Sequence, residues 1–432
     1  MGVNKKPRSK RLHVKRSRDV KKESVETPIQ TTSLGKVIDA VVPRFRGFYE
    51  SSGISFSEIE WRQLIRALRS ALPVSFRVRD NSTVIPESEY ITALGFANAY
   101  QIDIDPKKLK AELPELNSWL IENNKTGRIS RQEIVSMIPV AVLGIKRNHQ
   151  VLEMCSSPGS KTTQASDIAI DGVVVANELS RSRSHTLANR AAAKNVIVTC
   201  HKAQTFPETC GPFDRIICDV PCSGDGAIRK YVDKWAHWDP TVGRQLHATQ
   251  LQIALRAARL LRVGGQMTYS TCSLNPIENE AVVAALIKAT DGALEIVTKS
   301  IHALNVSPGL TKWQVVDEDL SIVSEVKSSR YRETMFSGER DQQTFNCMRL
   351  YPHLNNSGGF FVALLKKTKT WPVTTAPSSL EKKFDRFNLA NEGGQIGVKR
   401  SSRVFTVNQA TADFLTQPGA EFINVVSAGV TR

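Results

Sequence analysis

Residues 151–162 read VLEMCSSPGSKT, and this stretch decides how the middle of the chain folds. The apolar run Val151–Met154 predicts a short strand, the small residues after it predict a loop, and a helix is expected from Lys161. Backbone amides in such a loop can approach a ligand at a helix N-terminus, which favours negative charge. The loop has neither the GxxxxGK[ST] spacing nor a GxGxxG fingerprint. We expect a nucleotide-like ligand to lie against Cys155, Ser156, Ser157, Pro158, Gly159, Ser160 and Lys161.

The alternation of strand and helix continues along the chain. It predicts a mostly parallel sheet covered on both faces, with ligands at the carboxyl ends of the strands. Glu178 ends the second strand, where its carboxylate can accept both ribose hydroxyls; the alternative is a surface carboxylate that caps the next helix. We expect strands at Val173–Ala176, Val196–Thr199, Arg215–Asp219, Gln266–Thr271 and Phe360–Leu365, and helices at Ser180–Ala193 and Thr241–Arg262, the latter stopped by Gly264-Gly265.

Composition and charge exclude several classes of protein. The 432 residues carry 58 lysines and arginines against 42 acids, a net charge of +16, and the pI near 9.6 indicates a polyanionic partner such as nucleic acid. No apolar run reaches the ~18 residues of a membrane span. Seven dispersed cysteines fit a reducing compartment better than a disulfide scaffold. Residues 1–25 are densely basic, which predicts a nuclear address or a nucleic-acid tether, with a solubilising tail as the alternative.

Four segments are expected from these patterns. Before the alternating region, a small α+β unit is predicted from a helix at Phe56–Leu72 capped by Ser55 or Ser57, a strand at Val74–Val78 and a helix at Pro106–Leu120. Polar composition predicts a linker at Lys366–Lys383, and Ile423–Val426 resembles a strand. The predicted divisions are a basic disordered tail at 1–40, an RNA-facing α+β domain at 41–128, a catalytic domain at 129–370, and a linker with a short C-terminal segment at 371–432.

Two cysteines and an aspartate are predicted at the same edge of the sheet. Residues 219–226 read DVPCSGDG and close one strand, and Thr271-Cys272-Ser273 closes another. Carbon 5 of cytosine is too weak a nucleophile to take a methyl group directly. A thiolate that adds to carbon 6, with nitrogen 3 protonated by a carboxyl such as Asp219, activates it. Chemistry alone leaves open whether Cys222 or Cys272 is that nucleophile.

Other cysteines have simpler explanations. Cys218 lies on an apolar strand and is expected in the core, where free cysteine is common and inert. The spacing of Cys200, Cys210, Cys218 and Cys222 contains no CxxC pair, so the sequence predicts no metal site.

Five motifs occur in a fixed order and carry a family resemblance. They are ISRQE…SM at 129–137, the Pro-Gly-Ser-Lys loop, DVPCSGDG at 219–226, TCS at 271–273 with NPxENE at 275–280, and GGFF at 358–361. On these motifs the chain resembles the Sun/NSUN family of RNA cytosine-5 methyltransferases, especially its eukaryotic tRNA-modifying branch, over roughly residues 45–370. The resemblance implies a Rossmann-like, S-adenosylmethionine-dependent methyltransferase domain behind a small RNA-facing domain.

The resemblance also implies roles for the motif residues. Cys272 is the expected nucleophile, and Cys222 is expected to assist release of the product. Asp219 is expected to contact the cytosine and lie beside the cofactor, S-adenosylmethionine, which residues 155–161 and Glu178 would hold. RNA-binding charge is expected to include Arg229 and Lys230, which in the alternative reading belong to a solvated loop.

The chain departs from the family pattern at two places. His201-Lys202-Ala203-Gln204 carries Lys202 where the family usually has an aspartate that contacts adenosine, and lysine offers no acceptor. We expect either weaker cofactor binding or a neighbouring carbonyl that substitutes. Residues 422–430 resemble only the opening of the PUA-like RNA module of the tRNA branch, so a fragment or a shortened paralogue is expected.

The leading hypothesis is an S-adenosylmethionine-dependent tRNA cytosine-5 methyltransferase. Alternatives are an rRNA cytosine-5 methyltransferase, a catalytically silent RNA-binding paralogue, and an amino-group methyltransferase, whose sites need no thiol; DNA methylation is disfavoured by the resemblance. The expected partner is RNA, with no membrane and no obligate protein partner. The Lys-rich N-terminus predicts the nucleus or nucleolus, with the cytoplasm as the alternative, rather than mitochondria.

Overall fold

The structure is a computed structural model that describes residues 29–338, 341–371, 388–389, 396–400, 403–418 and 420–431. The basic stretch 1–25 and most of the predicted linker lie outside these residues. Helix α1 (Ile29–Ser51) begins inside the predicted tail, so the tail boundary at residue 40 is wrong. Helix α1 forms because its apolar residues recur at helical spacing: Ile38, Phe45 and Tyr49 lie on one face of the helix and are buried.

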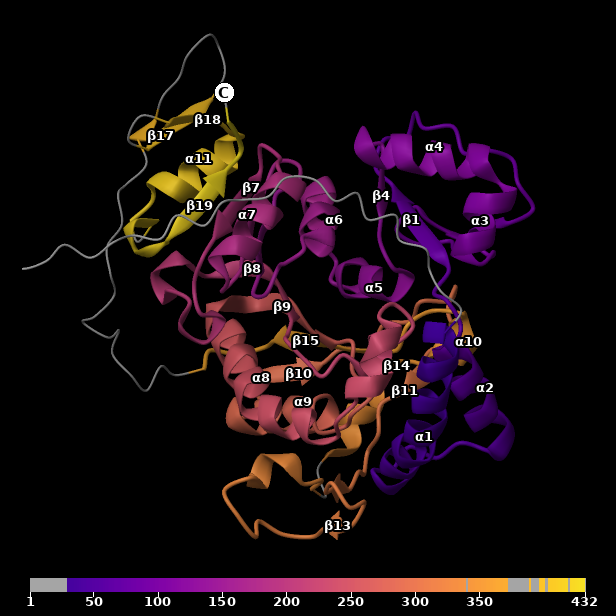
Figure 1. Cartoon of the computed structure of the whole chain (residues 1–432). Helices are drawn as coiled ribbons and strands as arrows, with labels where there is room; N and C mark the ends of the chain where they lie inside the picture. The colour runs from indigo at the N-terminus through magenta and orange to yellow at the C-terminus, as the bar shows by residue number, and fades with distance from the viewer. Residues whose placement is uncertain are drawn as a thin grey trace, which may run out of the picture.

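A long sheet runs through the centre of the molecule (Figure 1). Its five middle strands are parallel, and antiparallel strands extend both edges, so the sheet is mixed rather than mostly parallel. The order is β11 (Ser307–Pro308), β14 (Met348–Leu350), β15 (Phe360–Lys367), β9 (Leu261–Thr271), β8 (Phe213–Asp219), β5 (Gln150–Glu153), β6 (Val173–Asn177), β7 (Val196–Thr199) and β19 (Val425–Ala428), and β10 (Leu294–Ile296) pairs with β15.

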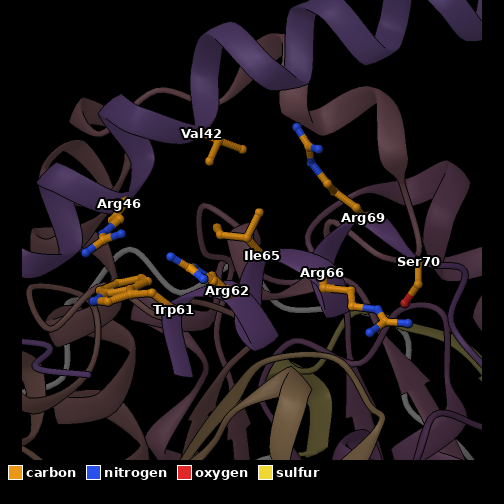
Figure 2. A pocket seen from close by; sticks show the side chains of 8 residues that line it. All are labelled: Val42, Arg46, Trp61, Arg62, Ile65, Arg66, Arg69 and Ser70. Carbon is orange, nitrogen blue, oxygen red and sulfur yellow. The ribbon is translucent and has the colours of Figure 1, made fainter. Parts of the chain in front are cut away.

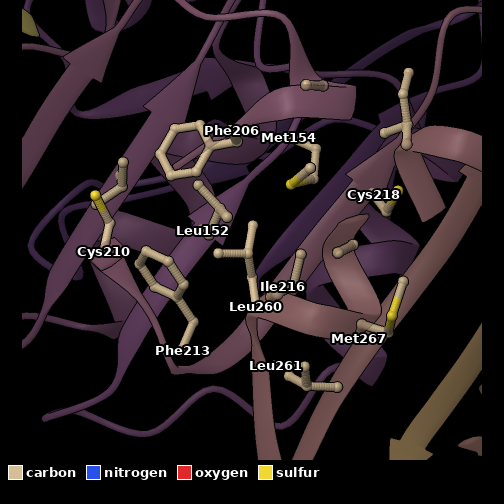
Figure 3. Close-up of a cluster of buried hydrophobic side chains, with 14 of the residues drawn as sticks. Leu152, Met154, Phe206, Cys210, Phe213, Ile216, Cys218, Leu260, Leu261 and Met267 are labelled. Atoms are coloured by element: carbon tan, nitrogen blue, oxygen red, sulfur yellow. The ribbon is translucent and has the colours of Figure 1, made fainter. Parts of the chain in front are cut away.

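Helices cover both faces of this sheet, as the sequence predicts. Alternate residues of each strand point to opposite faces, so Leu152 enters one buried cluster and Val151 the other. Figure 3 shows part of the first cluster, in which Cys218 is fully buried, as its apolar strand predicts. One face packs on α5 (Ile134–Val142), α6 (Ser160–Ile168) and α7 (Arg181–Arg190), and the other on α8 (Thr241–Leu260), α9 (Glu280–Ala289) and α11 (Gln409–Thr416).

The junction of α8 and β9 differs from the prediction. The helix ends at Leu260 and the strand begins at Leu261, so Gly264 and Gly265 lie within β9 instead of stopping the helix. A Cβ at Gly265 would lie 3.0 Å from the carbonyl oxygen of Asp214 on β8, and this close approach of two backbones explains a glycine in a strand.

A separate four-stranded sheet forms the unit before the central sheet. It is ordered β2 (Ile91–Ala93), β3 (Ala99–Ile102), β1 (Val74–Val78) and β4 (Ile129–Arg131). Strand β4 pairs with β1, so residues 129–131 belong to this unit and not to the catalytic domain. The predicted helix Pro106–Leu120 is two helices, α3 (Pro106–Glu112) and α4 (Pro114–Lys125), because Pro114 disfavours helical backbone at Leu113.

Helices α1 and α2 (Glu58–Arg69) lie against the catalytic domain instead of the small sheet (Figure 1). Ser57 caps α2 in a reciprocal capping box with Glu60, which confirms one of the two predicted caps. Trp61 of α2 and Phe45 of α1 share a buried cluster with Trp235. The short helix α10 (Pro352–Asn355) packs on α2. Strand β12 (Val315–Val316) pairs with β13 (Ile322–Val323), and Val316 joins the same buried cluster.

The C-terminal residues complete the far edge of the central sheet. Strand β19 pairs antiparallel with β7, with Val425 opposite Thr199, and Phe414 of α11 packs 6.0 Å from Phe213 between ring centroids. The predicted strand Ile423–Val426 is therefore present, shifted to Val425–Ala428. A small sheet beside it contains β16 (Asn388–Leu389), β17 (Gly397–Arg400), β18 (Arg403–Thr406) and β20 (Val430–Thr431). None of the helices in the described ranges is long and apolar enough to cross a membrane.

Candidate active site

The loops that follow the five parallel strands meet at one edge of the central sheet. β5 leads into the Cys155–Gly159 loop, β6 into Glu178, and β7 into His201. β8 ends at Asp219 directly before the Cys222 loop, and β9 ends at Thr271 directly before Cys272. Because parallel strands have their carboxyl ends on the same side, residues far apart in sequence converge here, as predicted.

The two predicted cysteines lie side by side. Their sulfur atoms are 3.3 Å apart, within hydrogen-bond distance, and both side chains are partly accessible. The hydrogen bond with Cys272, together with burial, raises the pKa of Cys222 well above its usual value. Either sulfur can be the donor in this contact, so the geometry pairs the two thiols without assigning the nucleophile.

Asp219 is fixed between two donors. Lys161 Nζ lies 2.7 Å from Oδ2, and the Ser270 hydroxyl donates to Oδ1 at 2.7 Å. Burial lowers the pKa of Lys161, but the charge and hydrogen bond of Asp219 outweigh it and raise the pKa overall. Lys161 also donates to Ser136 Oγ at 3.0 Å, so it joins α5, α6 and β8. The ion pair fixes the orientation of the Asp219 carboxylate.

The Glu278 carboxylate joins the two cysteine loops. It accepts from the Ser223 backbone N–H at 2.8 Å and the Ser223 hydroxyl at 2.5 Å on one loop. It accepts from the Ser273 hydroxyl at 2.6 Å on the other, and from Gln250 Nε2 at 3.0 Å. The side chain is fully buried, and burial followed by the charge of Asp225 raises its pKa. Glu278 lies in the NPxENE motif, and nothing in that pattern predicts its contacts with both cysteine loops.

Close backbone contacts hold the Cys272 loop from its other side. Gly226 N–H donates to the Cys272 carbonyl at 3.0 Å, and Gly359 N–H donates to the Gly226 carbonyl at 2.7 Å. A Cβ at Gly226 would lie 2.4 Å from the Gly359 carbonyl oxygen and 2.9 Å from that of Cys272. Only glycine fits at position 226. The close contact between Gly226 and Gly359 therefore explains why glycines occur in both the DVPCSGDG and the GGFF motifs.

A cavity of about 330 Å³ opens beside Asp219 at the ends of β5, β6, β7 and β8. Carboxylates of Glu178 and Asp219 and apolar groups such as Ile253 line it, which suits a molecule that combines ribose hydroxyls, a ring and a positive charge. S-adenosylmethionine has these features, so the residues present fit it. The lining residues are Met154, Cys155, Ser157, Asn177, Glu178, Leu179, Ser180, Arg183, His201, Ala203, Gln204, Asp219, Val220, Pro221, Thr249 and Ile253.

The predicted cofactor residues divide into two groups. Cys155, Ser157, Glu178 and Asp219 are in the lining of the cavity. Glu178 also accepts from the Ser180 backbone N–H at 2.9 Å at the start of α7, and it is buried rather than a surface carboxylate. The remaining loop residues shape the turn into α6 without joining the described lining: Ser156, Pro158, Gly159, Ser160 and Lys161.

Lys202 does not join the others. Its side chain is exposed, while its neighbours His201, Ala203 and Gln204 line the cavity. Lys202 therefore does not line the cavity where the family's aspartate was expected to contact adenosine. Gln204 supplies an amide with both donor and acceptor capacity at the same wall, a role that no sequence pattern predicts.

His201 ties this wall to the C-terminal residues. The Asn424 backbone N–H donates to His201 Nε2 at 2.6 Å, and the Cys200 N–H donates to the Asn424 carbonyl at 2.9 Å. Asn177 holds the same loop by accepting from the His201 N–H at 3.0 Å. Burial lowers the pKa of His201 to about 4, so the ring is neutral at pH 7 and can accept from Asn424. No sequence signal connected position 424 with this cavity.

The basic residues expected to contact RNA differ in exposure. Arg229 is buried and donates to the carbonyls of Ala71 and Ser357, both near 2.8–2.9 Å, so its predicted RNA contact is wrong. Its guanidinium joins the α2 region to the catalytic domain. Lys230 is exposed, as an RNA contact requires.

A groove of about 450 Å³ between α1 and α2 is rimmed by arginines (Figure 2). Arg46 pairs with Glu50 and Glu58, and Arg69 pairs with Asp39, so much of this charge is neutralised locally.

Among the residues that the structure describes, no group of three or more histidines, cysteines and acids is arranged to hold a metal ion.

Sequence comparison identifies related proteins. A family model described as 16S rRNA methyltransferase RsmB/F matches residues 140–366. The Drosophila melanogaster protein named tRNA (cytosine(34)-C(5))-methyltransferase is 36% identical over 392 residues, which cover 75% of this chain and 52% of that protein. A Saccharomyces cerevisiae multisite-specific tRNA:(cytosine-C(5))-methyltransferase is 34% identical over 378 residues, covering 76% and 55%. The chain thus spans about half the length of the curated relatives it matches.

Bacterial proteins and solved structures show more distant similarity. The Escherichia coli ribosomal RNA small subunit methyltransferase F is 34% identical over 256 residues, covering 57% of this chain and 46% of that protein. A methyltransferase homologue from Pyrococcus horikoshii superposes with a TM-score of 0.56 at 22% identity, covering 78% of this chain and 99% of the other. This likeness, together with the strand order, confirms the predicted Rossmann-like methyltransferase fold.

Proposed function

The chain belongs to the Sun (RsmB/F) family of RNA methyltransferases, and from this premise we propose that it methylates carbon 5 of cytosine in tRNA, with S-adenosylmethionine as methyl donor. One observation carries the proposal: the sulfurs of Cys222 and Cys272 lie 3.3 Å apart at the sheet edge that also bears Asp219 and the cavity. Methyl transfer to an amino group needs no thiol, so a pair of thiols at this place favours attack on a pyrimidine carbon.

In this proposal Cys272 is the nucleophile. Its thiolate adds to carbon 6 of the cytosine, and the electron pair of the 5,6 double bond moves through the ring as nitrogen 3 takes a proton from solvent. Carbon 5 then has the electron density of an enamine and can accept a methyl group. A water molecule acting as base takes the carbon 5 proton, and the electron pair of that C–H bond restores the 5,6 double bond and expels Cys272 as a thiolate. Nitrogen 3 then gives its added proton back to solvent.

Cys222 and Asp219 act beside that nucleophile. The protonated Cys222 sits against the sulfur of Cys272, where it can donate a proton to the departing thiolate and so assist release. The Asp219 carboxylate, fixed by Lys161 and Ser270, can accept a hydrogen bond from the N–H that forms when nitrogen 3 of the cytosine is protonated. Cytosine in a duplex hides carbon 6 in the stack, so the target must be flipped out or unpaired.

The cavity beside Asp219 is the proposed cofactor site. Glu178 would hold the ribose hydroxyls, the Cys155–Gly159 loop would face the methionine carboxylate, and Ala203 and Gln204 would flank the adenine. When bound, S-adenosylmethionine supplies a methyl group on a positively charged sulfur. The cavity bears the carboxylates of Glu178 and Asp219, and the exposed Lys202 is not in its described lining, which argues against the cofactor-deficient alternative.

Two RNA classes compete as substrate. The Drosophila melanogaster and Saccharomyces cerevisiae relatives are both named as tRNA enzymes, which favours tRNA. The family model and the Escherichia coli relative are named for ribosomal RNA, which keeps rRNA as the second candidate.

Labelled methyl transfer tests the proposal. The protein is incubated with labelled S-adenosylmethionine and purified tRNA, rRNA or DNA, and digested nucleosides are identified by mass spectrometry. The proposal expects 5-methylcytidine in tRNA. Label in rRNA alone would move the assignment to the second candidate, and N4-methylcytidine or an absence of label on every nucleic acid would contradict the reaction.

We also propose that the basic residues 1–25 direct the protein to the nucleus, on the strength of their ten lysines and arginines. A fluorescent fusion of the whole chain should accumulate there. A fusion without residues 1–25 should spread into the cytoplasm, and unchanged nuclear accumulation would contradict the proposal.

A further inference from the structure

An exposed aromatic ring stands directly after the Cys222 loop. Tyr231 is 48% exposed, so part of its ring, and not only its hydroxyl, is in contact with water. Two lysines frame the ring, with Lys230 Nζ at 5.5 Å and Lys234 Nζ at 5.8 Å from its centroid. Both distances are in the range of cation–π attraction, so the three side chains form one basic aromatic surface.

This surface adjoins the reacting sulfur. Lys234 Nζ donates to the carbonyl oxygens of Ser223 at 3.4 Å and Gly224 at 3.2 Å, on the Cys222 loop itself. A Cβ at Gly224 would lie 2.4 Å from Lys234 Nζ and 3.6 Å from Cys272 Sγ. The ammonium group and the proposed nucleophile therefore border the same small space, and the Tyr231 ring centroid lies 5.8 Å from the same ammonium.

The backbone beneath the ring is firmly held. Tyr231 N–H donates to the Ile228 carbonyl at 3.0 Å, and Lys234 N–H donates to the Tyr231 carbonyl at 2.9 Å. The 3-10 helix that follows, Val232–His237, is anchored by the buried Trp235, whose ring centroid is 5.1 Å from that of Phe45 on α1. A fixed backbone beneath an exposed ring costs little entropy when a ligand binds.

We propose that Tyr231, framed by Lys230 and Lys234, is a stacking site for the nucleotide next to the target cytosine in single-stranded RNA. This inference rests on the proposed function and specifies how that RNA is held. A flipped cytosine leaves its neighbour without a stacking partner, and an exposed ring replaces that partner with any base. The flanking ammonium groups match the phosphates on either side of such a nucleotide.

A short single-stranded RNA with one cytosine flanked by 2-aminopurine is the probe, because stacking quenches its fluorescence. Tyr231→Ala should raise the Kd for this RNA about tenfold, since a base–aromatic stack contributes that order of affinity. It should also remove the quenching. Tyr231→Phe keeps the ring and should stay close to wild type. Phe345→Ala removes a comparably exposed ring from the 3-10 helix Asp341–Asn346 and is the matched control.

The outcomes separate this inference from the proposed function. Tyr231→Ala that binds and quenches like wild type, in a protein whose wild type methylates RNA, overturns the stacking site and leaves the function standing. A wild type that neither binds the probe nor methylates any RNA overturns both. Weaker RNA binding in Tyr231→Ala with unchanged Kd for S-adenosylmethionine, and with Tyr231→Phe unaffected, supports the inference.

Discussion

The sulfur atoms of Cys222 and Cys272 lie 3.3 Å apart, although the two residues are separated by 50 positions in the chain. Two adjacent parallel strands, β8 and β9, end side by side and place the cysteines on neighbouring loops. The Glu278 carboxylate joins these loops, and the close glycine contacts at Gly226 and Gly359 hold them from the other side. The placement of the two sulfur atoms therefore depends on residues outside the pair.

Replacement of Glu278 should separate the two loops. Glu278→Gln exchanges a carboxylate oxygen for an NH₂ group that faces donors on Ser223 and Ser273, which leaves buried donors unpaired at a cost of about 1–3 kcal/mol. We expect a lower kcat for methyl transfer, with little change in the Kd for S-adenosylmethionine. Glu295→Gln, at an exposed site on β10, is the control. A Glu278→Gln enzyme with wild-type kcat would show that the hydrogen bonds from Glu278 to the two cysteine loops are not needed for methyl transfer.

Substitution of Gly226 tests the close backbone contacts. Gly226→Ala would place a Cβ 2.4 Å from the Gly359 carbonyl oxygen, and overpacking of this kind costs about 1–3 kcal/mol. The Tm should fall, and methyl transfer should fall further because the Cys272 loop shifts. Gly35→Ala in α1, where a Cβ would meet nothing within 4 Å, should not lower the Tm. Equal Tm values for the two variants would contradict the geometry.

The C-terminal residues should contribute to cofactor affinity. Asn424→Pro removes the N–H that donates to His201 Nε2, so the wall of the cavity loses a hydrogen bond and we expect a Kd for S-adenosylmethionine about 3–10 times higher. Asn424→Ala keeps that N–H and should bind nearly as well as wild type. Calorimetric titration of both variants checks this, and identical Kd values would mean that the contact does not support the cavity.

The same contact predicts a pH dependence of stability. The pKa of His201 is lowered by burial from 6.5 to about 4, so between these values the unfolded chain binds a proton that the folded chain does not. The stabilisation that the neutral, buried His201 gives the folded state is therefore fully present above pH 6.5 and is lost as the pH falls toward 4. The free energy of unfolding, measured by denaturant titration, should decline less over this range in His201→Gln than in wild type. Parallel curves would contradict the assignment.

The sequence predicts the middle of the chain well because local pattern and global fold agree there. Val196–Thr199 matches β7, and the loop around Gly159 lies between a strand and a helix as its small residues indicate. Both cysteines and Asp219 meet at the predicted edge, since the carboxyl ends of parallel strands share one side of a sheet.

The remaining features depend on contacts between distant residues. The sequence around Asn424 does not show that its backbone N–H reaches His201. Nor does the sequence around Arg229 show that its guanidinium donates to the carbonyls of Ala71 and Ser357. Lys202 was expected at the cofactor because of its position in a motif, but its side chain points to solvent while Gln204 lines the cavity. Side-chain direction at the end of a strand is set by the packing of the following turn, which the sequence does not show.

Covalent trapping on RNA tests the central claim most directly. Cys222→Ala lacks the group that assists release but keeps the nucleophile, so it should form a complex with tRNA that survives denaturing electrophoresis in the presence of S-adenosylmethionine. Cys272→Ala should form no such complex and should transfer no methyl group. A stable complex with Cys272→Ala, or full methyl transfer by that variant, would contradict the assignment of Cys272 as the nucleophile.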